Sequence, residues 1–321
     1  MNKRAIIFPI FLGMLFAAYT AILGISRQEQ LLLEEIAFSG FSEVVANRLR
    51  AQNDQMCRYA ATGDKSALES ALKTYEKTIH SFKVDRGMTD DEVWSRAARL
   101  LESDQDGKRV DKPILVAARN GQLKTMLFIV KLHKGKTLTT NEDIFKVRGV
   151  GGRTIFHNAA SAQQNSKTMF RICNRLIGKK YKVPAEELVK NLGDKKIKVE
   201  DITGAIFAKC LSEKDSAGNI ALNYEITERK GNEGDVQYLV EKGSNLSLKN
   251  NDGLKPLDIA RAKGTGIISK KYEIIEKAQQ DSPAGHYEKH RKIINKVKRF
   301  TKKTKKTLSP NVKKLVATLT D

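Results

Sequence analysis

The stretch GDVQYLVEKGSNLSLKNNDGLKPLDIARAKG, residues 234–264, decides which fold this sequence predicts. It contains two apolar runs with helical spacing, separated by the polar turn SNLSLKNNDG at residues 244–253. Gly243 can take the left-handed conformation that ends a helix, and Pro256 suits the first position of the next one. This arrangement predicts one unit of a helical repeat, and such a unit has to recur elsewhere in the chain.

The pattern does recur along the chain. The copies read KPILVAARNGQL (112–123), TIFHNAA (154–160), GNIALN (218–223) and GLKPLDIA (253–260). Their cores begin at Lys112, Thr154, Ile220 and Lys255, at spacings of 42, 66 and 35 residues. These residues resemble the ankyrin repeat, which has a period of about 33 residues and the signature T-P-L-H-x-A. A polar, glycine-rich insertion in residues 141–152 accounts for the spacing of 42, and its glycines, in RGVGGRT (148–154), indicate that this part is flexible. A degenerate or irregular copy between two clear ones accounts for the spacing of 66.

The signature letters have physical roles that this sequence keeps in part. Thr154 can cap a helix N-terminus with its hydroxyl. The signature histidine is kept only as His157, and the resemblance implies hydrogen bonds from it to the neighbouring repeat. Leu115, Asn223 and Asp258 occupy the matching places, so those bonds are not predicted for the other copies.

The predicted fold class is mostly α: an ankyrin-like helical solenoid of irregular repeats, preceded by an N-terminal apolar helix and followed by a basic tail. The predicted divisions are a transmembrane anchor or signal segment (1–26), a helical stem (27–52), the repeat domain (53–280) and the basic tail (281–321). The clearest repeat units lie near residues 112–136, 154–178, 220–250 and 255–278, and a weaker copy begins near Asp54.

The N-terminal segment predicts a membrane anchor. Residues 5–25 contain no charged side chain and follow Lys3 and Arg4. As a helix they extend about 30 Å, the thickness of one bilayer core. The basic residues before the segment place the N-terminus in the cytoplasm, and one such segment predicts a single-pass protein. Two alternatives remain: a secretory signal cleaved near residues 24–26, which would release a secreted protein, and a buried helix.

A stack of repeats leaves an extended surface free, because each helix pair buries its apolar face only against its neighbours. The resemblance to ankyrin repeats therefore implies a non-catalytic scaffold that binds another protein. The predicted contact residues lie at a helix end and on the polar turn: Arg119, Asn120, Gln122, Lys249, Asn250, Asn251 and Asp252.

The last 41 residues concentrate positive charge. Residues 281–321 hold twelve Lys or Arg and three Asp or Glu, in a chain with a formal net charge of +21. Helical spacing puts Ile293, Ile294, Val297 and Phe300 on one side, which suits an anionic lipid surface or an acidic protein. Sparse aromatic residues disfavour nucleic acid, and a solvated tail is the alternative. The predicted anion-binding residues are Arg291, Lys292, Lys296, Lys298, Arg299, Lys302, Lys303, Lys305 and Lys306.

Catalysis has no support in the sequence, and no cofactor, metal site or small-molecule substrate is predicted. The chain lacks the HExxH and GxSxG patterns. Cys57, Cys173 and Cys210 are far apart and odd in number, which disfavours a disulfide framework or a zinc site. The lysine-rich composition, divergent repeats and export-type leader resemble the ankyrin-repeat proteins of host-associated intracellular bacteria.

Overall fold

The computed structural model divides the chain into two compact units, residues 1–51 and 52–321. In the first unit it describes only residues 47–51, which are helical. The residues described in the whole chain are 47–86, 89, 111–132, 143–162, 165–194, 196–227, 232–263, 267–282, 284–304 and 308–320. These residues form helices and no β-strand, so the prediction of a mostly α protein is confirmed for them.

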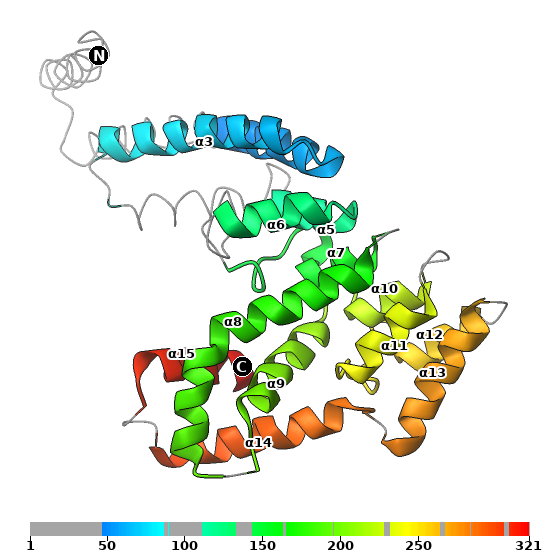
Figure 1. The fold of residues 1–321 in the computed structure, drawn as a ribbon. Coiled ribbons are helices and arrows are strands. Elements are labelled where there is room, and N and C mark those ends of the chain that lie inside the picture. Colours follow the sequence, from blue (N-terminus) through cyan, green and yellow to red (C-terminus); the bar gives the residue numbers. More distant parts are fainter. Residues whose placement is uncertain are drawn as a thin grey trace, which may run out of the picture. The chain divides into compact units, whose positions relative to one another are not determined.

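Four helix pairs follow one another among the described residues of the second unit (Figure 1). The first helices of the pairs are α5 (Pro113–Arg119), α7 (Ile155–Ala160), α10 (Ala221–Thr227) and α12 (Pro256–Lys263). The second helices are α6 (Leu123–Leu132), α8 (Ser166–Leu192), α11 (Glu233–Glu241) and α13 (Ile267–Asp281). The first helices pack in chain order, α5 on α7, α7 on α10 and α10 on α12. The four recurring stretches of sequence are therefore neighbours in space.

The helices begin and end where local signals in the sequence predict. Pro113 occupies the first position of α5, where its missing N–H costs no hydrogen bond. Thr154 Oγ1 accepts a hydrogen bond from the N–H of Phe156 at the start of α7. Gly243, with φ of 91°, follows the end of α11. These caps keep the helices short and reverse the chain from one helix of a pair into the next.

Small and aromatic side chains fill the interior between the pairs. Ala117 and Ala118 of α5 are fully buried, which allows the neighbouring helix to approach closely. Phe156 of α7 stacks on Phe145 and meets Phe207 edge to face, with ring centroids 6.0 Å and 5.7 Å apart. The core therefore includes Phe207, which lies outside the four recurring stretches.

The interval of 66 residues between Thr154 and Ile220 does not contain the degenerate repeat that its length suggested. Because α7 packs directly on α10, no repeat is stacked between them. The additional residues extend α8 to 27 residues and form α9 (Val199–Leu211), which packs along α8. The added helical residues are about as many as one repeat contains. The spacing alone could therefore not distinguish an inserted helical segment from a degenerate repeat.

A further helix pair precedes α5, where the sequence suggested a weak copy near Asp54. It joins a helix at residues 47–62 to α3 (Lys65–Arg86). Asn53 Nδ2 donates to the backbone oxygen of Asp111 at 2.9 Å, which ties the pair to the start of α5. With 22 residues, α3 is much longer than α6, which has 10, so this pair is not a regular copy of the repeat.

The basic C-terminal segment contains two helices, α14 (Tyr287–Thr304) and α15 (Pro310–Thr320). Helix α14 packs on α9, and α15 packs on α8 and α14 (Figure 1). Ile293, Ile294 and Val297 are buried in this packing. The alternative of a solvated tail is therefore wrong for these two helices, because their apolar side covers the α8–α9 insertion.

The predicted anchor at residues 1–26 lies outside the described residues, as does the stem up to residue 46. Among the helices that the structure describes, none combines the length and the apolar character needed to cross a membrane.

Candidate protein-interaction surface

Three turns of one geometry precede α7, α10 and α12, at residues 149–153, 215–219 and 250–254. In each turn the first residue's N–H donates to the fifth residue's carbonyl at 2.9 Å, and the fourth residue's N–H donates to the first residue's carbonyl at 3.0 Å. The fourth residues are Gly152, Gly218 and Gly253, with φ of 70°, 74° and 78°. These turns are therefore equivalent elements at one offset from the helix that follows, and we call them together the turn ladder.

The turns of the ladder are also bonded to one another. The N–H of Ser216 donates to the carbonyl of Gly151 at 2.9 Å, and the N–H of Asn251 donates to the carbonyl of Ala217 at 3.0 Å. A Cβ on Gly218 would lie only 2.8 Å from the backbone nitrogen of Asn251. Main-chain contacts of this closeness fix each turn against the next.

The first turn of the ladder corrects the prediction that residues 148–154 are flexible. Its backbone pairs with the second turn, and a Cβ on Gly152 would lie 2.7 Å from Ser216 Oγ. Ile144, Phe145 and Val147, just before it, are buried. The glycines are there because the turn needs left-handed backbone and close approach, not because the segment lacks structure.

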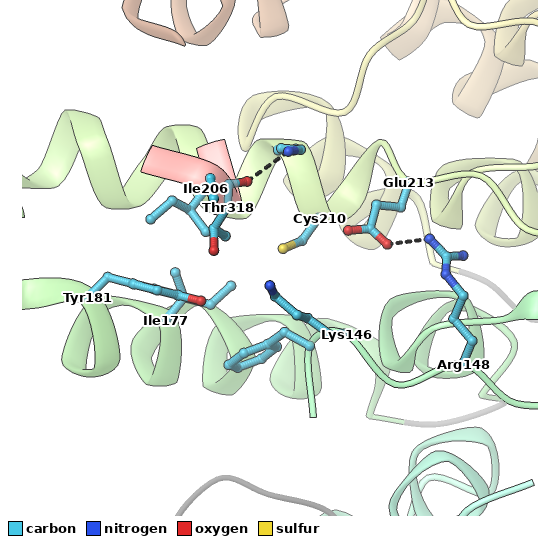
Figure 2. Close-up of a pocket in the computed structure, with 11 residues that line it drawn as sticks. Lys146, Arg148, Ile177, Tyr181, Ile206, Cys210, Glu213 and Thr318 are labelled. Carbon is cyan, nitrogen blue, oxygen red and sulfur yellow. Dashed lines mark hydrogen bonds and ion pairs between the residues drawn. The ribbon is translucent and has the colours of Figure 1, made fainter. Parts of the chain in front are cut away.

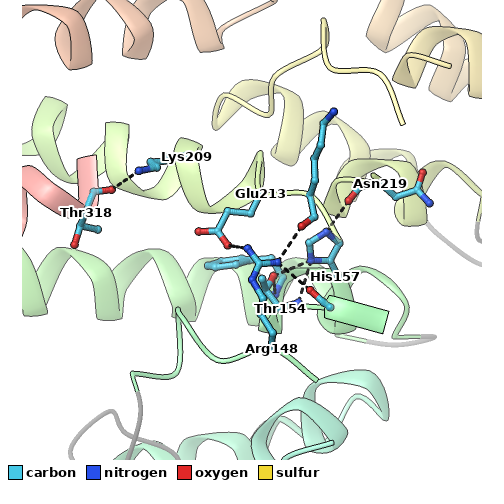
Figure 3. A network of polar contacts seen from close by, with 10 residues as sticks. Arg148, Thr154, His157, Lys209, Glu213, Asn219 and Thr318 are labelled. Atoms are coloured by element: carbon cyan, nitrogen blue, oxygen red, sulfur yellow. Dashed lines mark hydrogen bonds and ion pairs between the residues drawn. The ribbon is translucent and has the colours of Figure 1, made fainter. Parts of the chain in front are cut away.

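His157 links two consecutive repeats, as the resemblance implied (Figure 3). Its Nδ1 lies 3.1 Å from the backbone nitrogen of Thr154, and its Nε2 lies 2.9 Å from the carbonyl oxygen of Asn219. This pattern assigns the proton to Nε2, since Nδ1 accepts from the Thr154 N–H. Burial lowers the pKa of His157 and so favours this neutral form. The ring ties the start of α7 to the turn before α10.

The residues that replace this histidine elsewhere keep part of its role. Asp258 Oδ2 accepts the N–H of Lys255 at 2.9 Å, as His157 does for Thr154. Asn223 Nδ2 donates to Asn219 Oδ1 at 3.0 Å. Local capping therefore survives in α12 although the residue type has changed.

The contact residues predicted at the end of α5 have partners within the chain. Arg119 forms an ion pair with Asp111 at 3.0 Å. Asn120 Nδ2 donates to a backbone oxygen of α5 at 2.9 Å. Gln122 lies against Gly63, where a Cβ would be 2.5 Å from its Oε1. These side chains hold the helix end and its junction with the preceding pair, and their contact with a partner stays a prediction.

The contact residues predicted on the polar turn divide into two kinds. Asn250 Oδ1 accepts the N–H groups of Asp252 and Leu254, and Asn251 Nδ2 donates to the carbonyl of Ser216 at 3.0 Å. Lys249 and Asp252 have exposed side chains. Both asparagines therefore build the ladder, while Lys249 and Asp252 are available at its surface.

Two apolar side chains at the ladder were missed from the sequence. Val150 on the first turn is 51% exposed, and Leu254 on the third is 38% exposed. A second missed feature is the side chain of Arg153, which lies 4.5 Å above the ring of Tyr224. The sequence contained a signal for these residues, because the turns before α7 and α12 are equivalent. Val150 precedes α7 by as many residues as Asn251 precedes α12, and Arg153 matches Leu254 in the same way.

The predicted anion-binding residues on α14 fall into two groups, those with an ion pair inside the chain and those without one to a described residue. Arg291 pairs with Glu288 at 2.9 Å, and Lys296 pairs with Asp194. The exposed cations of α14 without an ion pair to a described residue are Lys292, Lys298, Arg299 and Lys302. The side chain of Lys303 and the whole of Lys305 and Lys306 lie outside the described residues.

A cavity of about 240 Å³ lies where α8, α9 and α15 meet residues 145–148 (Figure 2). Arg148 and Glu213 form an ion pair at one end, with Nη2 and Oε2 2.7 Å apart. Burial raises the pKa of Glu213, and the neighbouring Arg148 opposes that rise. Arg148 also donates to the carbonyl of Gly152 at 2.9 Å, which connects the cavity to the ladder (Figure 3).

The described residues contain no group of three or more His, Cys, Asp or Glu side chains placed to hold a metal ion. Cys57, Cys173 and Cys210 are free thiols, and burial raises the pKa of each.

No protein-family model and no curated protein matches the sequence. An ankyrin repeat domain from Acinetobacter baumannii AYE matches 69% of this chain and 95% of its own length, at 16% identity and a TM-score of 0.34. A structure of a predatory endopeptidase in complex with an immunity protein, from Bdellovibrio bacteriovorus, matches 70% of this chain and 97% of the matched chain, at 20% identity and a TM-score of 0.26. The chain's own features, which are the turn ladder, the paired helices and the histidine bond between repeats, show a divergent ankyrin-like fold.

Proposed function

We propose that this chain is a non-catalytic scaffold that binds another protein across the turn ladder. The observation that carries the proposal is a row of exposed turn residues with an apolar side chain on each outer turn, Val150 and Leu254. Ser216 and Ala217 are exposed on the second turn, and Asn251 is exposed on the third. Hydrogen bonds of the main chain already hold the ladder in place. Binding of a partner would therefore cost little conformational entropy on this surface.

The ladder and the helix α10 beside it supply residue types that are enriched at protein interfaces. Tyr224 on α10 donates its hydroxyl hydrogen to Asp215 of the second turn, and Arg153 of the first turn covers its ring. Tyrosine and arginine are enriched among the hot-spot residues that contribute most of the binding energy at protein interfaces. Their fixed placement next to the exposed turns favours the ladder over other faces as the binding surface.

A photo-crosslinking amino acid at Ala217 tests the proposal in cells that make the full chain. The matched control carries it at Lys182, an exposed position on α8. We expect a discrete adduct from position 217 and none of that size from 182. Changing Val150 and Leu254 together to Asp should remove the adduct and leave the thermal midpoint unchanged. An adduct that survives this double change, or that forms equally at 182, would show that the ladder is not the binding surface.

We also propose that residues 5–25 anchor the chain in a membrane with its N-terminus in the cytoplasm. The uncharged length and the preceding Lys3 and Arg4 support an anchor. Cleavage near residues 24–26 is the competing outcome. The intact mass of the mature protein, purified through a C-terminal tag from membrane and soluble fractions, decides between them.

The C-terminal helices support a second candidate function, binding of an anionic lipid surface. A groove of about 640 Å³ between α14 and α15 has apolar side chains such as Leu308 and Val316, flanked by Lys298, Lys302 and Lys313. A cationic rim beside an apolar floor suits an anionic lipid. Because the apolar side of α14 is buried in the protein, attraction between charges would dominate over insertion of the helix.

A further inference from the structure

The geometry points to a ligand for the cavity between α8, α9 and α15, and we propose that it is a small carboxylate with an apolar tail. The cavity measures about 240 Å³, roughly eight times the ~30 Å³ that one water molecule occupies in the liquid. Pockets for drug-sized ligands begin at about 300 Å³. The cavity therefore suits a smaller molecule, of roughly ten non-hydrogen atoms.

The polar end of the cavity has an excess of positive charge. Its lining includes Lys146, Arg148 and Lys209, with Glu213 as the carboxylate. Arg148 and Glu213 satisfy each other at 2.7 Å. Lys146 forms no ion pair with any residue that the structure describes. A carboxylate is the group that balances this ammonium, and an amine would be repelled by it.

Lys146 is an exposed residue that lines the cavity. Figure 2 shows its side chain reaching from the segment before α7 toward the space between Tyr181 of α8 and Cys210 of α9. Burial raises the pKa of Tyr181 to about 12, so its hydroxyl keeps a proton that it can donate to an anion. An ammonium and a hydroxyl, from the segment before α7 and from α8, thus both line the cavity across from α9.

The remaining wall is apolar. Ile177 of α8 is fully buried and Ile206 of α9 is 1% exposed, and both line the cavity. They provide the surface against which a short aliphatic tail packs. Burial raises the pKa of the Cys210 thiol, which keeps it protonated and a poor nucleophile. The site is therefore built to hold a ligand and not to react with it.

Calorimetric titration of the full chain with hexanoate tests the assignment, with hexan-1-ol and hexylamine as probes of matched length. We expect hexanoate to bind and to raise the thermal midpoint, because a ligand that binds only the folded state stabilises it. Replacing the ammonium in Lys146→Met should weaken hexanoate binding by about tenfold, the scale of one charge-assisted hydrogen bond. Lys146→Arg, which restores the charge, should recover most of the affinity.

Lys182→Met is the matched control, since it removes an exposed lysine of α8 that does not line the cavity. It should bind hexanoate as the unaltered chain does. Lys146 has an exposed side chain, so its Met variant should keep the unliganded midpoint. Absence of hexanoate binding, equal binding of hexan-1-ol or hexylamine, or full affinity in Lys146→Met would each overturn the proposal.

Discussion

His157 Nε2 donates to the carbonyl oxygen of Asn219 at 2.9 Å, across 62 residues of sequence. Asn219 closes the second turn of the ladder, where its N–H is held by Asp215 Oδ1 at 2.9 Å. One imidazole therefore couples the start of a helix in one repeat to the turn of the next. In a stack of repeats, such nearest-neighbour contacts supply the stability that a single helix pair lacks.

Replacing His157 by Ala should destabilise the chain by about 2–4 kcal/mol. The change leaves the Thr154 N–H and the Asn219 carbonyl without the imidazole partner and opens space in the interior. Urea unfolding followed by circular dichroism measures the loss. His80 is exposed on α3, so His80→Ala should stay within about 0.5 kcal/mol of the unaltered chain. Equal midpoints for the two variants would contradict the coupling role of His157.

Gly218→Ala and Gly253→Ala form a matched pair that isolates the close approach between turns. Both residues have positive φ, 74° and 78°, so both substitutions carry similar backbone strain. A Cβ on Gly218 would lie 2.8 Å from the backbone nitrogen of Asn251, whereas nothing lies within 4 Å of one on Gly253. We expect Gly218→Ala to cost about 1–3 kcal/mol more in the free energy of unfolding. Equal losses in urea unfolding would mean that the turns are not in tight contact.

His290 should make the stability of the chain depend on pH. Burial lowers the pKa of His290 to about 4, with Lys289, His286 and Lys242 adding to the effect and Asp201 opposing it. The unfolded chain binds the proton at about pH 6.5. Between these values the unfolded state binds more protons than the folded state. The contribution of His290 to stability is therefore fully present above about pH 6.5 and is lost progressively as the pH falls toward 4.

The measurement is the thermal midpoint at a series of pH values across that range. His290→Gln removes the titrating group, so the midpoint should fall less on acidification than in the unaltered chain. His80→Gln, at an exposed position, should keep the full dependence. An unchanged dependence in His290→Gln would show that other groups, such as the buried His157, dominate.

The exposed cations of α14 should govern any binding to anionic vesicles. Changing Lys298, Arg299 and Lys302 together to Gln should weaken binding by about 3 kcal/mol, at about 1 kcal/mol for each basic residue near the surface. Co-sedimentation with vesicles rich in phosphatidylserine, at several salt concentrations, measures the effect.

A control triple variant removes the same charge from exposed lysines elsewhere, at Lys77, Lys182 and Lys190. It should bind vesicles almost as the unaltered chain does, because its cations do not lie on α14 or α15. Similar losses of vesicle binding in both triple variants would show that the effect depends only on the net charge of the chain. If the triple variant on α14 kept its binding to vesicles but lost binding to single-stranded RNA, a nucleic-acid partner would be favoured over lipid.

The repeat units could be predicted because their signals are local. Pro113 and Thr154 start helices and Gly243 ends one through their own backbone and side-chain chemistry, whatever the rest of the chain does. The interval of 66 residues could not be assigned, because an inserted helical segment and a degenerate repeat have the same length. The packing of α7 on α10 distinguishes them, and that contact depends on the whole chain.

The sequence by itself determined the helical pairs, their caps and the concentration of charge after residue 281, and the resemblance to ankyrin repeats implied the bond from His157. Only the tertiary structure decided that residues 149–153 belong to the ladder, that α14 buries its apolar side against α9, and that Lys146 faces a cavity. The physical reason is the range of the interactions. Caps and turns form between residues a few positions apart, whereas contacts such as Lys209 Nζ to the Thr318 carbonyl, 109 residues away, form only when separate apolar faces have found each other.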